Sequence, residues 1–409
     1  MTSSSSLIDN QNLDSNGALL IADVTVSVIK DSEQLASLVA QWCQKDWLAL
    51  DTEFVRRDTY RAIPALIQFY DGEQVWLLDP QQDIDLTLLA QVFESDCIQV
   101  LHSAAEDLGV LYQCSGVWIN RLQDTQIGMA LLNLGQSVGY QKMIEALLAI
   151  ELDKDETQSD WLARPLSKQQ VQYAAEDVIH LAEAWQIQSQ KMQQKDNELP
   201  LPNQLQRQSC WLDDGSKLVN RAKALHQMEE ELAFERVKGA KRLHPKSLII
   251  VKKLAGWREA LAQKSNVPKG RILNDKSIVE IAMRQKSDRA FLAQAGVGSS
   301  LMKQFGDELI EVIEQAKAVP DQELPERYVL LPKDASGWLK RCHQQVERKA
   351  FKLDMDTTLL CRKKDLQDMV TTAWLSRKNE WPIEVDGWRQ QILQDDISEI
   401  VDQLIADRS

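Results

Sequence analysis

The chain has 409 residues, of which 44% are hydrophobic and 26% are charged, as in an ordinary globular protein of two or three domains. A net charge of −14 disfavours nucleic acid as a partner of the chain as a whole. The charge is uneven, however, because residues 236–289 hold 15 Lys and Arg against four acids. A local charge of +11 inside an otherwise acidic chain predicts a basic, nucleic-acid-binding module.

Several protein classes are disfavoured. No apolar run approaches the roughly 18 to 20 residues that a membrane span needs, and residues 1–16 lack the basic and apolar regions of a signal peptide. The six cysteines are widely spaced, with no C-x-x-C pair and no Cys/His cluster, which argues against a zinc site and a disulfide scaffold. We therefore expect a cytoplasmic protein, with no membrane partner, that begins with a disordered segment at residues 1–22.

The first half of the chain alternates between strand and helix patterns. Helical spacing covers residues 31–44, 86–94 and 106–113, and strand patterns cover residues 24–29, 47–54, 64–70, 74–78 and 97–102. Asp71-Gly72 between two of these strands is typical of a hairpin turn. From residue 124 to about 188 the pattern is almost wholly helical, interrupted by the polar stretch 153–164. This order predicts an α/β domain, in which helices flank both faces of a mixed sheet.

The second half is predicted to be all-helical. A Pro-rich break at residues 199–202 ends the α/β domain, and another at residues 320–332 divides the remaining part of the chain. Helical patterns fill residues 218–238, 247–266, 275–285, 300–318 and 337–406. The two resulting units are only weakly similar in sequence, which leaves a duplication open.

The strand at residues 48–54 carries two acids. Asp51 and Glu53 lie two positions apart, so a β-strand directs both carboxylates to the same side of its sheet. Two ionised carboxylates this close need a cation or solvent beside them. The pair predicts a metal site, and the alternative is a strand end with two solvated acids.

Two later segments offer partners for this pair. Asp107 begins a predicted helix, where an acid also gains from the helix dipole, so it could simply be a first-turn acid. Tyr173 and Asp177 are four residues apart in a strongly helical stretch and share one helix face. The alternative for this second pair is a packed tyrosine beside a hydrogen-bonded aspartate.

Taken in order, these five residues resemble the DEDD exonuclease superfamily, in the subgroup whose third motif is Tyr-x-x-x-Asp. Residues 50–56 (LDTEFVR), 102–108 (HSAAEDL) and 159–166 (SDWLARPL) are similar to ribonuclease D. The resemblance spans about residues 23–190 and implies a ribonuclease H-like α/β exonuclease domain. Residues 254–259 (LAGWRE) with Pro268 resemble an HRDC module, and residues 359–370 and 385–389 resemble a second, more divergent one. The expected domains are 23–200 (exonuclease), 201–320 (HRDC), 321–334 (linker) and 335–409 (HRDC-like).

The resemblance also implies a chemistry. Two divalent cations, Mg²⁺ or Mn²⁺, would be bridged by Asp51, with Glu53 and Asp177 completing the shell of the ion that bears the attacking water. Asp107 would hold the other ion, largely through water, and Tyr173 would orient the attacking water. The implied reaction is 3′ to 5′ hydrolysis of RNA, such as tRNA precursors and small structured RNAs, to 5′-mononucleotides. The alternatives are a 3′ to 5′ DNA exonuclease and a catalytically silent nucleic-acid-binding adaptor.

Other residues are candidates for contacting the RNA, and no obligate protein partner is evident. Near the predicted site these are His102, Arg56, Arg57 and Arg164, with a packing histidine and ordinary solvated arginines as the alternatives. In the basic module the candidates are Lys252, Lys253, Lys269, Arg271 and Lys276. Their alternative is the solvated surface of a structural bundle, but the large local charge excess favours salt-sensitive phosphate contacts.

Overall fold

The computed structural model describes residues 7–8, 18–152, 159–227, 229–240, 243–325, 331 and 333–407. The chain forms two compact units. The first comprises Met1–Phe54, Pro64–Ala222 and Leu330–Ser409, and the second comprises Val55–Ile63 and Lys223–Val329. Within the described residues, no helix is both long and apolar enough to cross a bilayer.

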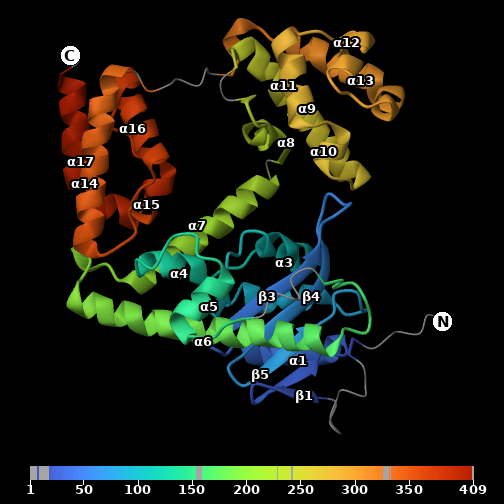
Figure 1. The fold of residues 1–409 in the computed structure, drawn as a ribbon, viewed down its shortest axis with the longest axis vertical. Helices are drawn as coiled ribbons and strands as arrows, with labels where there is room; N and C mark the ends of the chain where they lie inside the picture. Colours follow the sequence, from blue (N-terminus) through green and yellow to red (C-terminus); the bar gives the residue numbers. More distant parts are fainter. Residues whose placement is uncertain are drawn as a thin grey trace. The chain divides into compact units, whose positions relative to one another are not determined.

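The first unit is built on a mixed seven-stranded sheet in the order β1-β2-β5-β4-β3-β6-β7 (Figure 1). Neighbours β1 and β2, and β4 and β5, are antiparallel, whereas β5 with β2, β6 with β3, and β7 with β6 are parallel. The strands are β1 (Ala18–Ile21), β2 (Val24–Val28), β3 (Trp47–Val55), β4 (Ile63–Tyr70), β5 (Gln74–Leu78), β6 (Ile98–Leu101) and β7 (Leu122–Asp124). The predicted mixed sheet is confirmed.

The predicted hairpin joins β4 to β5. Asp71 Oδ1 accepts hydrogen bonds from the backbone N–H groups of Glu73 (3.0 Å) and Gln74 (2.9 Å). Gly72 adopts a φ of +91°, a left-handed conformation that glycine reaches without a steric penalty. The Asp-Gly pair therefore closes the turn through the aspartate acceptor and the left-handed glycine, the two properties for which such pairs are common in turns.

Helices cover both faces of the sheet. On one face, Leu48 and Leu50 of β3 share a core with α1 (Ser32–Trp42), α2 (Ala90–Phe93) and α3 (Asp107–Ser115). On the other, Ala49 shares a core with α4 (Thr125–Leu131), α5 (Tyr140–Leu148) and the 31-residue α6 (Lys168–Glu198), which lies across the sheet in Figure 1. Even-numbered β3 residues thus point towards α3, and odd-numbered ones towards α6.

The prediction that residues 1–22 are disordered is wrong for the part that the structure describes. Residues 18–21 form β1, and Leu7 and Ile8 are buried, with Ile8 in a bridge to Leu166. The partner of Ile8, Leu166, lies far away in the sequence, whereas β1 pairs with the neighbouring β2 but is only four residues long, too short for its strand pattern to be recognised. In the predicted interruption at 153–164, residues 153–158 lie outside the described residues.

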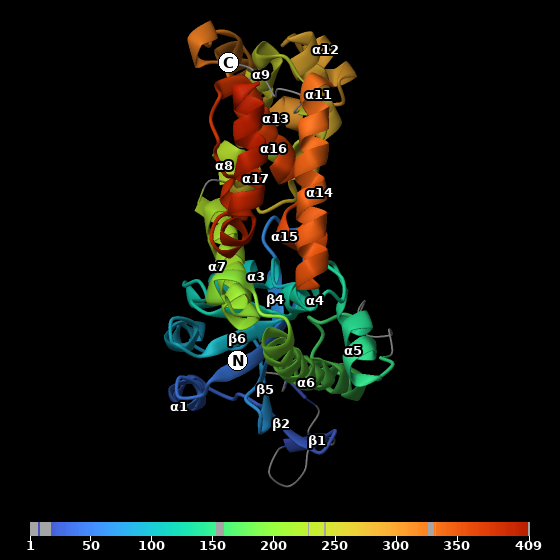
Figure 2. The same cartoon turned by 90° about the vertical axis from the view of Figure 1, so that its left-hand side faces the viewer.

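The first unit continues beyond the sheet into α7 (Arg207–Gln227) and the C-terminal helices α14 (Ser336–Leu353), α15 (Thr357–Leu360), α16 (Lys363–Ser376) and α17 (Trp388–Ala406). Figure 2 shows α14 beside α17, and the two helices pack together. Leu131 of α4 and Met192 of α6 share one hydrophobic core with Trp211 of α7 and with these helices. Packing thus groups residues 201–222 and 333–407 with the seven-stranded sheet, whereas the domain limits expected from the sequence stay a prediction.

The second unit is a helical bundle. Its helices are α8 (Glu229–Leu232), α9 (Pro245–Ser265), α10 (Lys269–Ile272), α11 (Asp275–Arg284), α12 (Arg289–Gln294) and α13 (Ser299–Lys317). Leu254 of α9 lies in a core with Ile278 of α11 and Leu309 of α13. Arg258 is buried and pairs with Asp275 at 2.8 Å, which ties α9 to the start of α11.

The two helical regions repeat one backbone pattern at an offset of 88 residues. A long helix ends at a left-handed residue, Asn266 (φ 48°) in one and Asp354 (φ 47°) in the other. One helical turn follows, α10 or α15, and an extended residue, Leu273 or Cys361, leads into the next helix. We call residues 245–317 the first helical module and residues 336–406 the second.

Candidate active site

Three carboxylates meet where β3 faces α6. Asp51 and Glu53 are odd-numbered β3 residues and therefore lie on the α6 side, where Asp177 extends from the helix. One oxygen from each of these three side chains lies within 4.8 Å of the others. The predicted partners of the strand acids are thus brought together by a strand, a helix and the side-chain alternation of the strand.

Asp107 approaches from the other face of the sheet. It begins α3 and is buried, and its Oδ1 accepts a hydrogen bond of 2.5 Å from Thr52 Oγ1. Thr52 is the even-numbered residue between the two strand acids, so β3 presents the two acids on one face and a support for Asp107 on the other. Asp107 lies outside the 4.8 Å group, but its charge is close enough to raise the pKa values of Asp51 and Glu53.

The loop before Asp107 is held by a residue that was not predicted. Asp124 accepts hydrogen bonds of 2.9 Å from the backbone N–H groups of Ser103 and Ala104, and it also caps α4 through Gln126 N at 2.8 Å. Ser103 has a φ of 55°, so these bonds stabilise an unfavourable backbone conformation just before α3. The Asp-Thr pair at 124–125 is a recognisable helix start, but its second task depends on the parallel pairing of β7 with β6.

Two aromatic side chains complete the surroundings of Asp177. Tyr173 hydrogen-bonds the Asp177 carboxylate, as expected for a pair four residues apart on one helix. Burial raises the pKa of Asp177, and this hydrogen bond lowers it in part. Tyr140, which was not predicted, donates a hydrogen bond of 2.5 Å to the backbone carbonyl of Asp177. Its signal in the sequence is only a tyrosine at the first position of a helix, so spacing alone could not reveal it.

His102 lies beside these groups in a packed position. Its Nδ1 is 2.9 Å from Thr125 Oγ1, and its ring meets Tyr140 edge-on with centroids 5.6 Å apart. Burial lowers the pKa of His102 below its usual range, so the ring is neutral at pH 7. These contacts favour the packing alternative over a phosphate contact.

The proton affinities of the site acids are those of a crowded, buried anionic site. Burial, reinforced by charge repulsion between the acids, raises the pKa of Asp51 well above its usual range and that of Glu53 to about 8. Burial likewise raises the pKa of Asp177 to about 7 and that of Asp107 to about 6, against the lowering effect of their hydrogen bonds. A divalent cation would reverse these shifts by neutralising the repulsion.

The donor set fits hard divalent cations. Every side chain of the cluster offers a carboxylate oxygen, and no Cys or His belongs to it. Such oxygens suit Mg²⁺, Mn²⁺ or Ca²⁺ rather than a structural zinc ion. The site is therefore a candidate centre for divalent cations, held by Asp51, Glu53 and Asp177 with Asp107 nearby.

The RNA-contact prediction is wrong for Arg164. All five N–H donors of its guanidinium are used, by both oxygens of buried Asp79 and by the carbonyls of Ala65, Trp161 and Ala163. Its side chain is only 9% exposed, and its contacts within the protein leave no donor free for a phosphate. Arg56 and Arg57 are exposed on residues 55–63 of the second unit, and their role stays a prediction.

The basic candidates of the first helical module fall into two groups. Lys252, Lys253 and Lys276 are exposed, and Lys252 lies over the ring of Phe234 at 5.7 Å. Lys269 and Arg271 instead pair with the carboxylates of Glu259 and Asp58. RNA contact by any of them stays a prediction, with the first three the more available.

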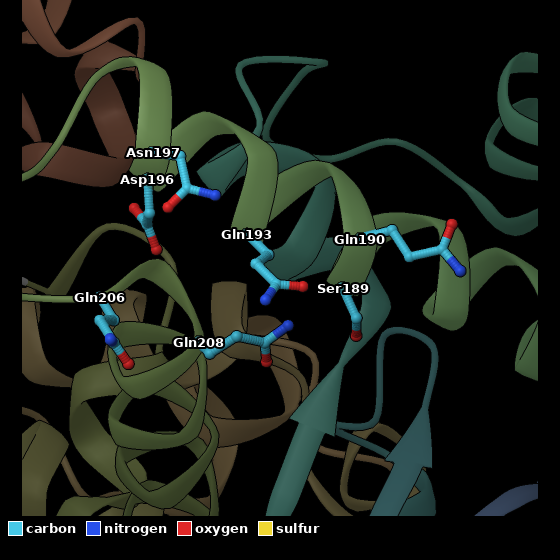
Figure 3. Close-up of a pocket in the computed structure, with 7 residues that line it drawn as sticks. All are labelled: Ser189, Gln190, Gln193, Asp196, Asn197, Gln206 and Gln208. Carbon is cyan, nitrogen blue, oxygen red and sulfur yellow. The ribbon is translucent and has the colours of Figure 1, made fainter.

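A cavity of about 380 Å³ lies elsewhere, between α6 and α7 (Figure 3). Most of its lining side chains are amides, among them Gln193 and Gln208, and its one acid, Asp196, pairs with Arg207 at 2.5 Å. Its first lining residue, Ser189, lies twelve positions after Asp177, which is roughly 18 Å along α6. The cavity is therefore distinct from the carboxylate cluster.

Comparison with known proteins agrees with this geometry. Residues 26–193 match the model of a 3′-5′ exonuclease family, and residues 247–313 match that of the HRDC domain. Ribonuclease D of Pseudomonas paraeruginosa is 33% identical, with 89% of this chain and 94% of the relative aligned, and that of a Shewanella species is 30% identical over 91% and 93%. The crystal structure of Escherichia coli RNase D, described as an exoribonuclease involved in structured RNA processing, superimposes with a TM-score of 0.80 at 26% identity, covering 92% of this chain and 99% of that one. The chain therefore belongs to the ribonuclease D family of 3′ to 5′ exoribonucleases.

Proposed function

We propose that this exoribonuclease removes 5′-mononucleotides from the 3′ ends of tRNA precursors and other small structured RNAs, using two Mg²⁺ or Mn²⁺ ions. The observation that carries the proposal is the meeting of Asp51, Glu53 and Asp177 within 4.8 Å in a member of this family. Such RNA substrates would place the protein in the cytoplasm, where its six free cysteines would stay reduced.

In this proposal the four acids hold the cations. Asp51, Glu53 and Asp177 supply oxygens from the α6 side of β3, and Asp107 supplies one from the start of α3. Bound divalent ions supply a nucleophile at neutral pH and stabilise the charge that develops on the leaving oxygen. Thr52 keeps one oxygen of Asp107 oriented by donating to it, so the other oxygen can serve as a ligand.

Tyr173 would orient the attacking water. Burial and the neighbouring carboxylates raise the pKa of Tyr173 far above neutral pH, so it keeps its proton. A protonated phenol can donate to, or accept from, a water molecule, but it is a poor general base. Positioning is therefore the role that its proton affinity supports.

The substrate class rests on the helical modules. The exposed lysines of the first module would bind phosphates without regard to sequence, which suits an enzyme that moves along its substrate. We further propose that the second module is a divergent HRDC-like domain. The 88-residue repeat of backbone pattern supports this, because Val251, Leu254 and Ala262 of α9 and their counterparts Leu339, Cys342 and Ala350 of α14 are all buried.

The test is gel analysis of cleavage of a 5′-labelled RNA with a single-stranded 3′ end, with Mg²⁺ or Mn²⁺, and with EDTA. We expect a metal-dependent ladder that shortens from the 3′ end, and Asp51→Asn should slow it at least about 100-fold because a shared ligand is lost. Asp46→Asn, at an exposed position just before β3, is the matched control.

The two alternative functions, a DNA exonuclease and a nucleic-acid-binding adaptor, predict different results. Faster cleavage of matched DNA than of RNA would favour the DNA exonuclease. Tight, salt-sensitive RNA binding without cleavage in either metal would favour the adaptor. A substrate panel of a tRNA precursor, a mature tRNA and an unstructured RNA of equal length then tests the proposed substrate class.

A further inference from the structure

The end of α9 in the first helical module holds residues 55–63, the segment that follows β3. Asn266, the left-handed residue after α9, accepts hydrogen bonds at its Oδ1 from the backbone N–H groups of Tyr60 (3.2 Å) and Arg61 (3.3 Å). Because the donors are backbone N–H groups rather than side chains, these bonds fix the path of the segment's backbone. The partner segment and the module belong to the same compact unit.

Side chains reinforce this attachment. Tyr60 Oη donates a hydrogen bond of 2.7 Å to Glu259 Oε1, and Gln263 Nε2 donates to the same phenol oxygen at 3.3 Å. Glu259 is only 1% exposed and Lys269 Nζ is 3.4 Å from its carboxylate, so the phenol donates to a buried and partly neutralised acid. An ion pair of Asp58 with Arg271 adds a further contact.

The second module makes a similar attachment at the equivalent corner, the left-handed residue after its first long helix and the short helix that follows. Asp354, which corresponds to Asn266 in the 88-residue repeat, accepts a hydrogen bond of 2.7 Å from Asn133 Nδ2 and pairs with Lys195 Nζ at 2.6 Å. Four residues later, Thr358 Oγ1 donates to Gln136 Oε1 at 2.6 Å. Asn133 and Gln136 belong to the loop between α4 and α5.

Both held segments adjoin residues of the active site. Residues 55–63 continue the strand that carries Asp51 and Glu53, and no other segment separates them. The loop held by Asp354 leads to Tyr140 at the start of α5, and Tyr140 donates to the carbonyl of Asp177. Two corresponding residues of two repeated modules therefore hold two segments, one continuous with the strand that carries Asp51 and Glu53 and one leading to Tyr140, which contacts the backbone of Asp177.

We propose that Asn266 and Asp354 are positioning residues for the nuclease reaction, through which the helical modules orient the strand and helix that carry the metal ligands. The proposal rests on the proposed function of the carboxylate cluster. The modules then have a second task besides RNA binding, and weakening either corner should slow chemistry on RNA that is already bound.

Substitutions at left-handed positions allow a sharp test. Asn266→Gly removes the acceptor without backbone strain, because glycine is the residue most favoured there, and Asn266→Asp keeps an acceptor. Asp354→Gly and Asp354→Asn form the matching pair. Gln285→Gly is the control, since it makes the same change at the left-handed end of α11 (φ 54°), where the side chain contacts Ser247 within the module.

Single-turnover cleavage of a saturating short RNA is measured beside equilibrium binding of the same RNA in the Asp51→Asn background. We expect each glycine variant to lower the single-turnover rate at least about threefold while its dissociation constant changes less than twofold. The conservative variants should restore the rate, and Gln285→Gly should match the unmodified protein. Unchanged rates in both glycine variants, or a loss confined to binding, would overturn the proposal.

Hydrogen exchange separates this inference from the proposed function. In the full chain, Asn266→Gly should speed exchange of the Tyr60 and Arg61 amides and of β3 peptides, whether or not the protein cleaves RNA. Cleavage by the unmodified protein together with unchanged exchange at these sites would reject the positioning role and leave the nuclease function intact. Absence of cleavage in the unmodified protein would reject the nuclease function, while altered β3 exchange would still report on the corner.

Discussion

Single side chains of the site already define how the protein should respond to pH. In the metal-free protein the folded-state pKa values of Glu53 (about 8) and Asp177 (about 7) exceed those of ordinary carboxyl groups, which titrate near 4. The folded state therefore binds protons more tightly than the unfolded state. The stabilisation is fully present below about pH 4 and is lost as pH rises through 7 to 8.

We predict that the metal-free protein loses about 3 to 4 kcal/mol of unfolding free energy between pH 6 and pH 8 from these two groups, several degrees in Tm. Asp177→Asn should flatten that dependence and raise Tm at pH 8. Because cations bind the deprotonated acids, the Tm increase caused by 10 mM Mg²⁺ should be larger at pH 8 than at pH 6. Thermal unfolding with EDTA or Mg²⁺ at both values is the measurement, and a Mg²⁺ effect that is larger at pH 6 would contradict the prediction.

At this scale the sequence predicted the carboxylates that the structure brings together and missed the residues that support them. Asp51, Glu53 and Asp177 were recognisable because strand and helix periodicities are local and place side chains on a known face. Asp124 and Tyr140 were not, because the groups they hold, the amides of residues 103–104 and the carbonyl of Asp177, lie far away in the sequence. Arg164 matched a family motif yet proved to be a buried partner of Asp79, since burial cannot be read from a motif.

Among the elements, β7 and α7 show how a short strand is fixed. Trp211 Nε1 donates a hydrogen bond of 2.7 Å to the carbonyl of Asp124, and Gly215, one turn later, brings α7 against the carbonyl of Leu122. A Cβ at position 215 would lie 1.9 Å from that oxygen. The three-residue strand, which ends at Asp124, is therefore held by a close backbone approach that only glycine permits.

Gly215→Ala should destabilise the protein by about 1 to 3 kcal/mol, because α7 must move away from β7. Gly337→Ala is the control: it adds the same methyl group inside α14 with no heavy atom within 4 Å, and should be neutral or slightly stabilising. Thermal or urea unfolding of both variants is the measurement. Equal stability of the two variants would show that the approach of α7 relaxes without cost.

The predicted elements were confirmed where the hydrophobic periodicity is strong, and short strands that form only by pairing with neighbouring strands were missed. The long helices α9, α11 and α13 begin and end within a few residues of the predicted limits, because helical periodicity is a local signal, and for α11 the cap Asn274 adds another. The strands β1 and β7 are only four and three residues long, too short for an alternation to be recognised, and they were missed. Their strand conformation depends on neighbours supplied by the rest of the sheet.

For the whole molecule, the charge counted for the basic module at residues 236–289 must be corrected for ion pairs. Among its described residues, Lys246, Arg258, Lys269, Arg271, Arg284 and Arg289 all pair with acids, several of which lie outside residues 236–289. The local excess of +11 counted in the sequence therefore overstates the charge available to RNA. Exposed lysines such as Lys252, Lys253 and Lys276 would carry most of the phosphate contacts.

Deleting everything after residue 200 would be a poor test of this idea. Trp211, Leu339 and Val346 share a core with Leu131 and Met192 of the nuclease part, so truncation would expose a large apolar surface. Substitution of charges leaves that core intact and changes only the electrostatic contribution to binding.

We therefore predict that the combined change of Lys252, Lys253 and Lys276 to Gln weakens RNA binding and reduces the slope of log K against log salt by up to about 2, roughly 0.7 for each phosphate that is no longer neutralised. Lys30, Lys191 and Lys340, exposed on the first unit, are changed to Gln together as a control with the same loss of charge. Fluorescence anisotropy of a labelled RNA between 50 and about 300 mM KCl, in the Asp51→Asn background, measures both slopes. An equal loss of slope in the two triple variants would mean that net charge, rather than the basic surface of the first helical module, draws RNA to the protein.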